Sequence, residues 1–219
     1  ISWTSGTIYE MYRQDYSINN PAPQTSATHL YRSNFYVMNS DYRVYECIFN
    51  GADPTNSNKG IISLEEPTHT DLQPRQESDG YIWKYLYSIK PNDIIKFDSV
   101  EYIPVPGNWD TNTDVADVRN AAVDGKIEVI TIEDVSTAAY QYSGTKNNVP
   151  IRGDGQDGEA SVTFVDGKPT SVTVTNGGTG YTFATLDLDS VVSGSGAVFT
   201  VIIPPVGGHG KDIYRELGA

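Results

Sequence analysis

The sequence has one cysteine, few basic residues and no long apolar run, and each absence excludes a class of protein. Because Cys47 is the only cysteine, no disulfide can form within the chain, which excludes a small disulfide-stapled fold. No run approaches the roughly 18 apolar residues of a membrane-spanning helix, so we expect no membrane partner. Lys and Arg number 15 against 28 Asp and Glu, a formal net charge of −13. An acidic chain without a basic patch argues against a nucleic-acid partner.

The sequence also lacks the polar clusters that catalysis and metal binding usually require. His29, His69 and His209 are scattered, so a zinc site would have to collect ligands from three distant segments. We therefore interpret them as surface or hydrogen-bonded histidines. Cys47 lies in an expected strand with acidic neighbours, which favours a buried, inert thiol over a nucleophile. We predict no enzymatic activity and no cofactor.

Acidic residues are plentiful, so two kinds of acidic site need a separate argument. A glycosidase needs two carboxylates in a groove, one of them in an apolar pocket, and nothing marks the available pairs in this way. Those pairs are Glu65 with Glu66, Glu133 with Asp134, and Asp187 with Asp189. Solvated charges at sheet edges are the simpler interpretation. The turn at 153–159 has the composition of a calcium loop, but its Glu comes too early for an EF-hand. A tight hairpin turn is the preferred interpretation, and calcium binding there stays open.

Aromatic residues divide the chain into two regions. Of the 15 Tyr, 11 precede residue 121, as do all three Trp, whereas the remainder is rich in Val, Thr, Gly and Asp. This change of composition indicates a domain boundary. We expect residues 1–121 to form an aromatic-rich β-sheet domain with short helices and a long loop at 50–79.

Within the first region, three β-rich runs predict strands. Runs at 35–38 and 42–49 are separated by a polar turn, which predicts a hairpin whose second strand is covered on both faces. The run at 81–89 predicts a third strand. Short helices are expected at 91–97 and 113–122, because each stretch begins with residues that favour a helix N-terminus.

The second region contains an internal repeat. An Asp-Gly-Lys triplet occurs at 124–126 and again at 166–168, and each is followed by a strand pattern and a Gly-rich turn. Residues 122–205 are therefore expected to form a β-sandwich of two hairpin repeats. Residues 206–219 are expected to be a Gly-rich linker into a missing C-terminal part. The fold class that follows is mainly β (a β-rich α+β fold), with a layered β-sandwich core, short helices in loops and a small antiparallel β repeat domain.

Aromatic strand motifs and both ends of the chain resemble a family of viral proteins. The motifs are Asn34-Phe35-Tyr36-Val37, Tyr42-Arg43-Val44-Tyr45-Glu46-Cys47-Ile48-Phe49-Asn50, Asp79-Gly80-Tyr81-Ile82-Trp83-Lys84-Tyr85-Leu86-Tyr87, Trp3-Thr4-Ser5-Gly6-Thr7-Ile8-Tyr9, Gly207-Gly208-His209-Gly210 and Glu216-Leu217-Gly218-Ala219. They resemble the gene-eight baseplate wedge subunit of T-even-like contractile-tailed bacteriophages. The resemblance implies a β-rich, two-domain structural virion protein of the tail baseplate, assembled in the host cytoplasm and without catalytic residues. It also implies a homodimer that docks onto other baseplate wedge proteins, with no small-molecule substrate.

An interface role would explain why the first region is rich in Tyr and Trp. Tyr and Trp provide large contact areas at low side-chain entropy cost and concentrate at interfaces. Aromatic residues outside the expected strands are predicted to be exposed, and the candidate interface residues are Tyr12, Tyr16, Tyr31 and Trp109. The alternative is a carbohydrate-binding tail-fibre or adhesin-type module, in which Trp109 or Tyr102 would line a shallow groove. A third interpretation, an enzyme that degrades cell-wall polymer, lacks an acid/base pair.

Overall fold

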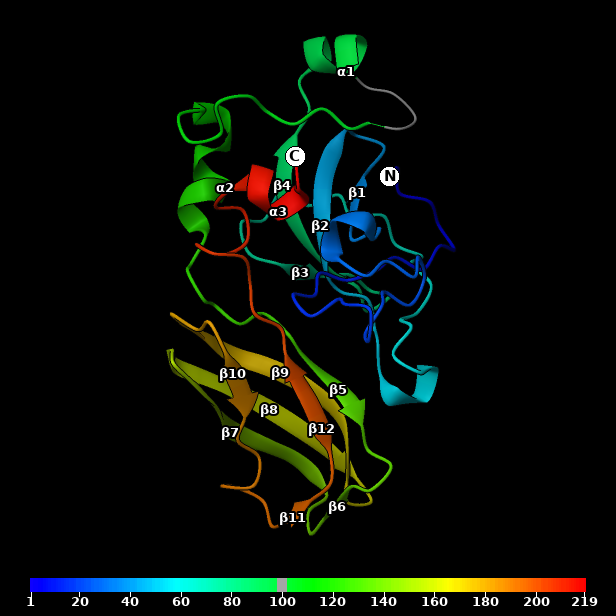
Figure 1. Cartoon of the computed structure of the whole chain (residues 1–219), viewed down its shortest axis with the longest axis vertical. Helices are drawn as coiled ribbons and strands as arrows, with labels where there is room; N and C mark the ends of the chain where they lie inside the picture. Colours follow the sequence, from blue (N-terminus) through cyan, green and yellow to red (C-terminus); the bar gives the residue numbers. More distant parts are fainter. Residues whose placement is uncertain (98–101) are drawn as a thin grey trace. The chain divides into compact units, whose positions relative to one another are not determined.

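A computed structural model describes residues 1–97 and 102–219 of the chain (Figure 1). The fold is mainly β, as the sequence predicts, with 34% of residues in strands and 12% in helices. No helix in the described ranges is long and apolar enough to cross a membrane. The chain divides into two compact units. Unit 1 comprises residues 1–51, 59–122 and 209–219, and unit 2 comprises residues 52–58 and 123–208.

Unit 1 is built on a four-stranded antiparallel sheet in the order β1-β2-β4-β3. The strands are β1 (Tyr36–Met38), β2 (Arg43–Phe49), β3 (Arg75–Gln76) and β4 (Ile82–Ser88). The predicted hairpin and third strand are thereby confirmed. The side chain of Asn39 fixes the hairpin turn, because its Oδ1 accepts backbone hydrogen bonds from Asp41 at 3.0 Å and Arg43 at 2.8 Å.

Strand β2 is covered on both faces, because its five interior residues from Val44 to Ile48 are all buried. Aromatic rings from several segments pack around this sheet. Tyr81 stacks on Trp83 with ring centroids 5.3 Å apart, and Tyr9 meets Trp83 edge-on at 5.7 Å. Such pairs contribute about 0.5–1.5 kcal/mol each beyond the area they bury. Most of the aromatic surplus of the first region is therefore core.

The helices of unit 1 are short. They are η1 (Leu30–Arg32), α1 (Pro91–Phe97), η3 (Thr113–Val115), α2 (Ala116–Ala121) and α3 (Ile213–Leu217). The predicted helix at 91–97 is α1, and the one predicted at 113–122 is the 3-10 turn η3 continued by α2. Asn112 caps η3, since its side chain accepts a hydrogen bond from the backbone N–H of Asp114 at 3.0 Å.

The end of the chain differs from the expected linker. Residues 209–219 belong to unit 1 and contain α3, whose Ile213, Glu216 and Leu217 are buried. Gly218 ends this helix with a φ of +70°, and a Cβ there would lie 2.7 Å from the ring of Tyr31. The glycine-rich composition that suggested a linker instead permits tight turns around a packed segment.

Unit 2 is an all-antiparallel, sandwich-like β-structure. Its main sheet has the order β10-β7-β8-β9, and the pairs β12-β5 and β11-β6 complete it. The elements are η2 (Pro54–Asn56), β5 (Ile130–Asp134), β6 (Ala139–Tyr140), β7 (Gly144–Gly153), β8 (Gln156–Val165), β9 (Lys168–Thr179), β10 (Ala184–Leu186), β11 (Gly194–Ser195) and β12 (Val198–Val201). The main sheet curls so that β5 lies beside β9 and β12 beside β10 (Figure 1).

The two Asp-Gly-Lys triplets play different parts in unit 2, which the repeat did not predict. Asp166 and Gly167 form a two-residue turn between β8 and β9, with Val165 opposite Lys168. The first triplet does not join paired strands, because β5, the strand that follows it, pairs with β12. Gly125 of this triplet has a φ of +63°, and a Cβ on it would lie 2.1 Å from the backbone nitrogen of Tyr181. Only glycine fits there.

Candidate functional site

A pocket in unit 1 lies where the end of β4, the start of α1 and the segment around Pro106 converge. Its volume is about 570 Å³, within the range of ordinary ligand and docking pockets. The lining is Tyr85, Ser88, Ile89, Lys90, Pro91, Asp93, Pro104, Val105, Pro106, Gly107, Asn112, Asp114 and Val115. Proline rings and apolar side chains therefore make up much of the wall.

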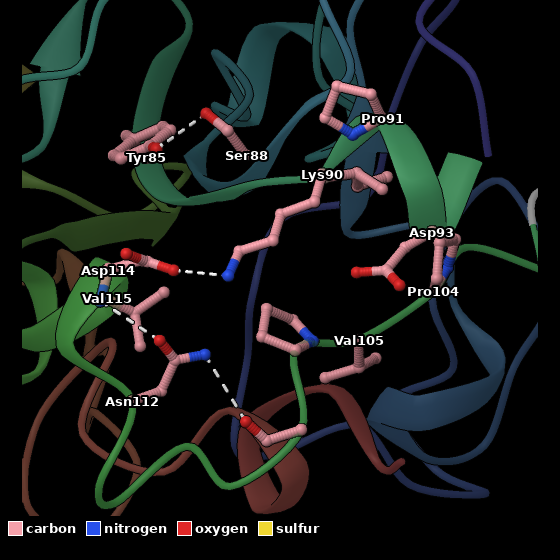
Figure 2. Close-up of a pocket in the computed structure, with 13 residues that line it drawn as sticks. Tyr85, Ser88, Lys90, Pro91, Asp93, Pro104, Val105, Asn112, Asp114 and Val115 are labelled. Carbon is pink, nitrogen blue, oxygen red and sulfur yellow. Dashed lines mark hydrogen bonds and ion pairs between the residues drawn. The ribbon is translucent and has the colours of Figure 1, made fainter. Parts of the chain in front are cut away.

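The polar groups of the pocket are mostly paired with one another, as Figure 2 shows. Lys90 reaches toward Asp114, with Nζ 2.5 Å from Oδ2, and this ion pair raises the pKa of Lys90. Tyr85 and Ser88 share a hydrogen bond between hydroxyls at 2.8 Å. The Asn112 amide donates to the Gly107 carbonyl oxygen at 3.4 Å. The described residues of the lining include no histidine or cysteine, so the pocket suits contact with an apolar or proline-containing segment better than acid/base chemistry.

Helix α1 beside this pocket is poorly covered. None of its side chains from Pro91 to Lys96 is buried, and Ile95 is 84% exposed. Tyr102, which follows in the described chain, is 71% exposed. A helix of this length is not stable in water without packing of an apolar face. The surface formed by α1 and the pocket is called the α1 surface below.

A second site of unit 1 is a cluster of three ionisable residues, Glu46 on β2, His209 after Gly208, and Glu216 on α3. His209 Nδ1 lies 2.9 Å from Glu46 Oε2 and 2.8 Å from Glu216 Oε1. Both carboxylate side chains are 0% exposed. The other Glu216 oxygen accepts the backbone N–H of Gly210 at 2.6 Å, whereas Glu46 Oε1 has no hydrogen-bond partner in the described chain.

Burial and mutual charge set the protonation of this cluster. Burial raises the pKa of Glu46, and the neighbouring Glu216 raises it further. Burial by itself would lower the pKa of His209, but the two carboxylates outweigh it and raise that pKa to about 10. Burial likewise opposes ionisation of Glu216, but the hydrogen bond and charge of His209 lower its pKa overall. The metal-free cluster at neutral pH is therefore an imidazolium between one carboxylate and one carboxylic acid.

Three of the four predicted interface residues are buried, so the expectation of exposure was wrong for Tyr12, Tyr16 and Trp109. The physical reason is largely the C-terminal segment, residues 209–219. Tyr12 meets the His209 ring edge-on at 4.8 Å, and Trp109 donates its indole N–H to the Lys211 carbonyl oxygen at 3.1 Å.

Of the other two interface candidates, Tyr31 also contacts the C-terminal segment, whereas Tyr16 packs elsewhere. Tyr16 packs in a small cluster with Ala22 and Ala27. Tyr31 is 51% exposed and donates its hydroxyl to the Arg215 carbonyl oxygen at 2.7 Å. Tyr12, Tyr31 and Trp109 thus contact a segment of their own chain, while Tyr31 alone also offers a substantial exposed surface.

The other two histidines and the cysteine lie outside both sites. His29 is exposed, and His69 is buried beside Tyr45 with ring centroids 5.4 Å apart. Cys47 is fully buried, which raises the pKa of its thiol well above its usual range. A buried thiol of this kind is unreactive.

Two of the acidic candidates, Asp187 and Asp154, make local hydrogen bonds. Asp187 lies 3.2 Å from Arg152, and this hydrogen bond lowers its pKa, the opposite of what a glycosidase acid needs. In the turn at 153–159, Asp154 accepts hydrogen bonds from the Thr182 side chain, at 2.5 Å, and from the backbone of Thr182 and Phe183. These bonds lower its pKa to about 2. Asp154 is therefore accounted for as a cap that ties this turn to the segment before β10.

Sequence reasoning missed both sites. Pocket residues come from segments of ordinary composition. The prolines at 104 and 106 are the one sequence feature that could have indicated an apolar surface there. The ionisable cluster joins residues separated by 163 positions, so no local spacing could reveal it. No protein family matches the chain, and no curated protein or solved structure matches it significantly.

Proposed function

We propose that this protein is a structural subunit of the tail baseplate wedge of a contractile-tailed bacteriophage. In this proposal it forms a homodimer and docks onto other wedge proteins, and it has no catalytic activity and needs no cofactor. The family assignment rests on the aromatic strand motifs and the two end motifs of the sequence. The structural observation that supports docking is the α1 surface.

The chemistry of the α1 surface favours a protein partner. Ile95 exposes an apolar side chain that would gain about 1.5–3 kcal/mol on full burial. The adjacent pocket offers proline and valine walls with an ion pair between Lys90 and Asp114. Apolar contact surrounded by polar groups is the usual composition of a protein interface.

The carbohydrate-binding alternative loses one of its two aromatic residues. Trp109 is 1% exposed and cannot act as a sugar platform, which leaves Tyr102 alone. Sugar sites commonly combine an exposed aromatic face with free polar groups, whereas most polar groups of the pocket are paired. The geometry therefore favours docking.

Co-assembly with the other wedge proteins of a T-even-like phage tests the proposal. Light scattering is expected to give a mass near twice 24.0 kDa, and the purified chain is expected to enter wedge complexes. Ile95→Glu should lower the affinity for the neighbouring subunit at least tenfold, because it places a charge in the contact. Ile18→Glu is the matched control, since Ile18 is 82% exposed and does not line the pocket.

Two outcomes would overturn the proposal. One is a chain that does not enter wedge complexes at all. The other is a trimer that binds bacterial surface polysaccharide, which would favour the adhesin alternative. Equal losses in the Ile95 and Ile18 variants would refute the α1 surface as the docking site while leaving the wedge assignment standing.

A further inference from the structure

The ionisable cluster of unit 1 brings together three metal-ligating side chains from three distant segments. One ligand atom of each of Glu46, His209 and Glu216 lies within 4.8 Å of the others, and all three residues are buried. Strand β2 and helix α3 hold the two carboxylates, while Tyr12 meets the imidazole edge-on. The arrangement is thus fixed by secondary structure and packing.

An independent observation is the unsatisfied oxygen of Glu46. Its Oε1 has no hydrogen-bond partner among the described residues, and the whole side chain is 0% exposed. A buried polar atom left unpaired costs about 1–3 kcal/mol, so such an atom calls for an explanation. A cation bound by both oxygens of Glu46 would satisfy it.

We propose that Glu46, His209 and Glu216 form a binding site for a divalent transition-metal ion, for which Zn²⁺ is the probe. His209 Nδ1, Glu216 Oε1 and the two Glu46 oxygens would supply one nitrogen and three oxygens, a donor set that Zn²⁺ accepts. Two carboxylates also neutralise the charge of a divalent ion in a buried setting. This proposal is independent of the wedge assignment.

The present spacing defines what metal binding must change. Ligand atoms from different residues around a four-coordinate zinc ion are about 3.3 Å apart, given metal–ligand distances near 2.0–2.1 Å. The 2.8 and 2.9 Å separations in the cluster fit hydrogen bonds through a proton on Nδ1. The ion would replace that proton, and the ligands would move apart by about half an ångström. It would then fasten the C-terminal segment to β2.

Hydrogen bonds position groups near this site, and the ligand types favour particular metals. Lys84 lies opposite Glu46 in the register of β2 and β4, and its ammonium group donates to the Leu72 carbonyl oxygen. Gly210 donates its N–H to Glu216 Oε2, which orients that carboxylate and leaves Oε1 for the ion. An imidazole ligand in the set favours Zn²⁺, Co²⁺ or Ni²⁺ over Mg²⁺.

The experiment uses the full chain, stripped of metal by a chelator and titrated with ZnCl₂ by calorimetry. We expect one Zn²⁺ per chain, and no comparable binding of Mg²⁺. Glu46→Gln and Glu216→Gln are expected to weaken Zn²⁺ binding at least tenfold, because an amide is a poorer ligand than a carboxylate. His29→Gln should bind as the wild type does, since His29 is exposed and outside the cluster.

A second measurement does not depend on variants that fold. Wild-type chain loaded with Co²⁺ is expected to show the intense visible bands of a four-coordinate site, and Zn²⁺ should displace them. Absence of stoichiometric Zn²⁺ binding, or a six-coordinate Co²⁺ spectrum, would overturn the proposal. Binding that the His29 variant loses and the Glu46 and Glu216 variants keep would identify an adventitious surface ion and overturn it as well.

Discussion

Replacing His209 by Gln removes the positive charge between Glu46 and Glu216 while keeping a side chain of similar reach. In the metal-free protein, Glu216 is ionised at pH 7 because His209 lowers its pKa. Without the imidazolium, a lone carboxylate would remain in a fully buried position. We expect Glu216 to take up a proton instead, so that both carboxyls are neutral in the folded variant.

The cost of that proton uptake gives the expected magnitude. Protonating a carboxyl with an ordinary pKa of 4.5 costs about 1.4 kcal/mol for each pH unit above that value. The variant should therefore lose about 3.4 kcal/mol at pH 7 and about 0.7 kcal/mol at pH 5. The value at pH 7 agrees with the roughly 3–5 kcal/mol lost when one partner of a buried ion pair is removed.

Trp fluorescence offers a selective assay, because Trp3, Trp83 and Trp109 all belong to unit 1. Urea unfolding in the presence of a chelator follows this unit without a contribution from metal. With an m-value of about 1.5 kcal/mol/M, the midpoint should fall by about 2 M at pH 7 and by about 0.5 M at pH 5. His29→Gln serves as the control and should leave the midpoint unchanged.

A loss that is equal at both pH values would refute the electrostatic reasoning, because steric disruption does not depend on the protonation of Glu216. A loss below 1 kcal/mol at pH 7 would show that His209 carries little charge in the folded protein. Adding Glu216→Gln to the His209 variant provides a further check. The double variant should recover most of the stability at pH 7, because position 216 then carries a neutral amide and no second buried carboxyl has to take up a proton.

Three other predictions follow from particular contacts. Metal-free unit 1 should lose stability as the pH rises from about 6.5 to 10. Folded His209 keeps its proton up to a pKa of about 10, whereas the unfolded chain releases this proton near pH 6.5. Urea unfolding at pH 6, 8 and 10 measures the free energy of unfolding, and a value that rises with pH would contradict the prediction. Tyr181→Phe should destabilise unit 2 by about 1–3 kcal/mol, because the Tyr181 hydroxyl donates to Ile151 at 3.0 Å and accepts the Gly158 N–H at 3.1 Å. Faster amide exchange at Gly158 checks it, and unchanged exchange would refute it. Gly125→Ala should lower the stability of unit 2 by more than about 3 kcal/mol, because the new Cβ would clash with the Tyr181 backbone and residue 125 has a positive φ. Thermal unfolding followed by circular dichroism measures the loss, and a loss under about 1 kcal/mol would be inconsistent with that contact.

Local patterns were sufficient for the hairpin of β1 and β2. Asn39 and the residues after it specify a turn by hydrogen bonds between neighbours in the sequence, and β-branched and aromatic residues on each side favour strands. The short helices at 91–97 and 113–121 follow from proline and capping residues in the same way. In these elements the interactions that decide the structure join residues a few positions apart.

The C-terminal segment shows where local reasoning failed. Its glycines suggested a linker, and the exposure predicted for Tyr12 and Trp109 followed from their position outside strands. The structure packs this segment against both residues, through His209 and Lys211. Burial depends on which distant segment covers a side chain, and composition does not predict which segment that is.

Sequence patterns alone predicted the mainly β class, the strands of the first region and the hairpin of β1 and β2, because periodicity and turn chemistry act over short distances. The α1 surface and the cluster of Glu46, His209 and Glu216 arise from contacts between distant segments, which these patterns do not reveal. That cluster exists because α3 returns to β2 after the chain has passed through residues 123–208 of unit 2. Charges and ligand atoms interact through space over a few ångströms, so their chemistry is set by which segments the fold brings together.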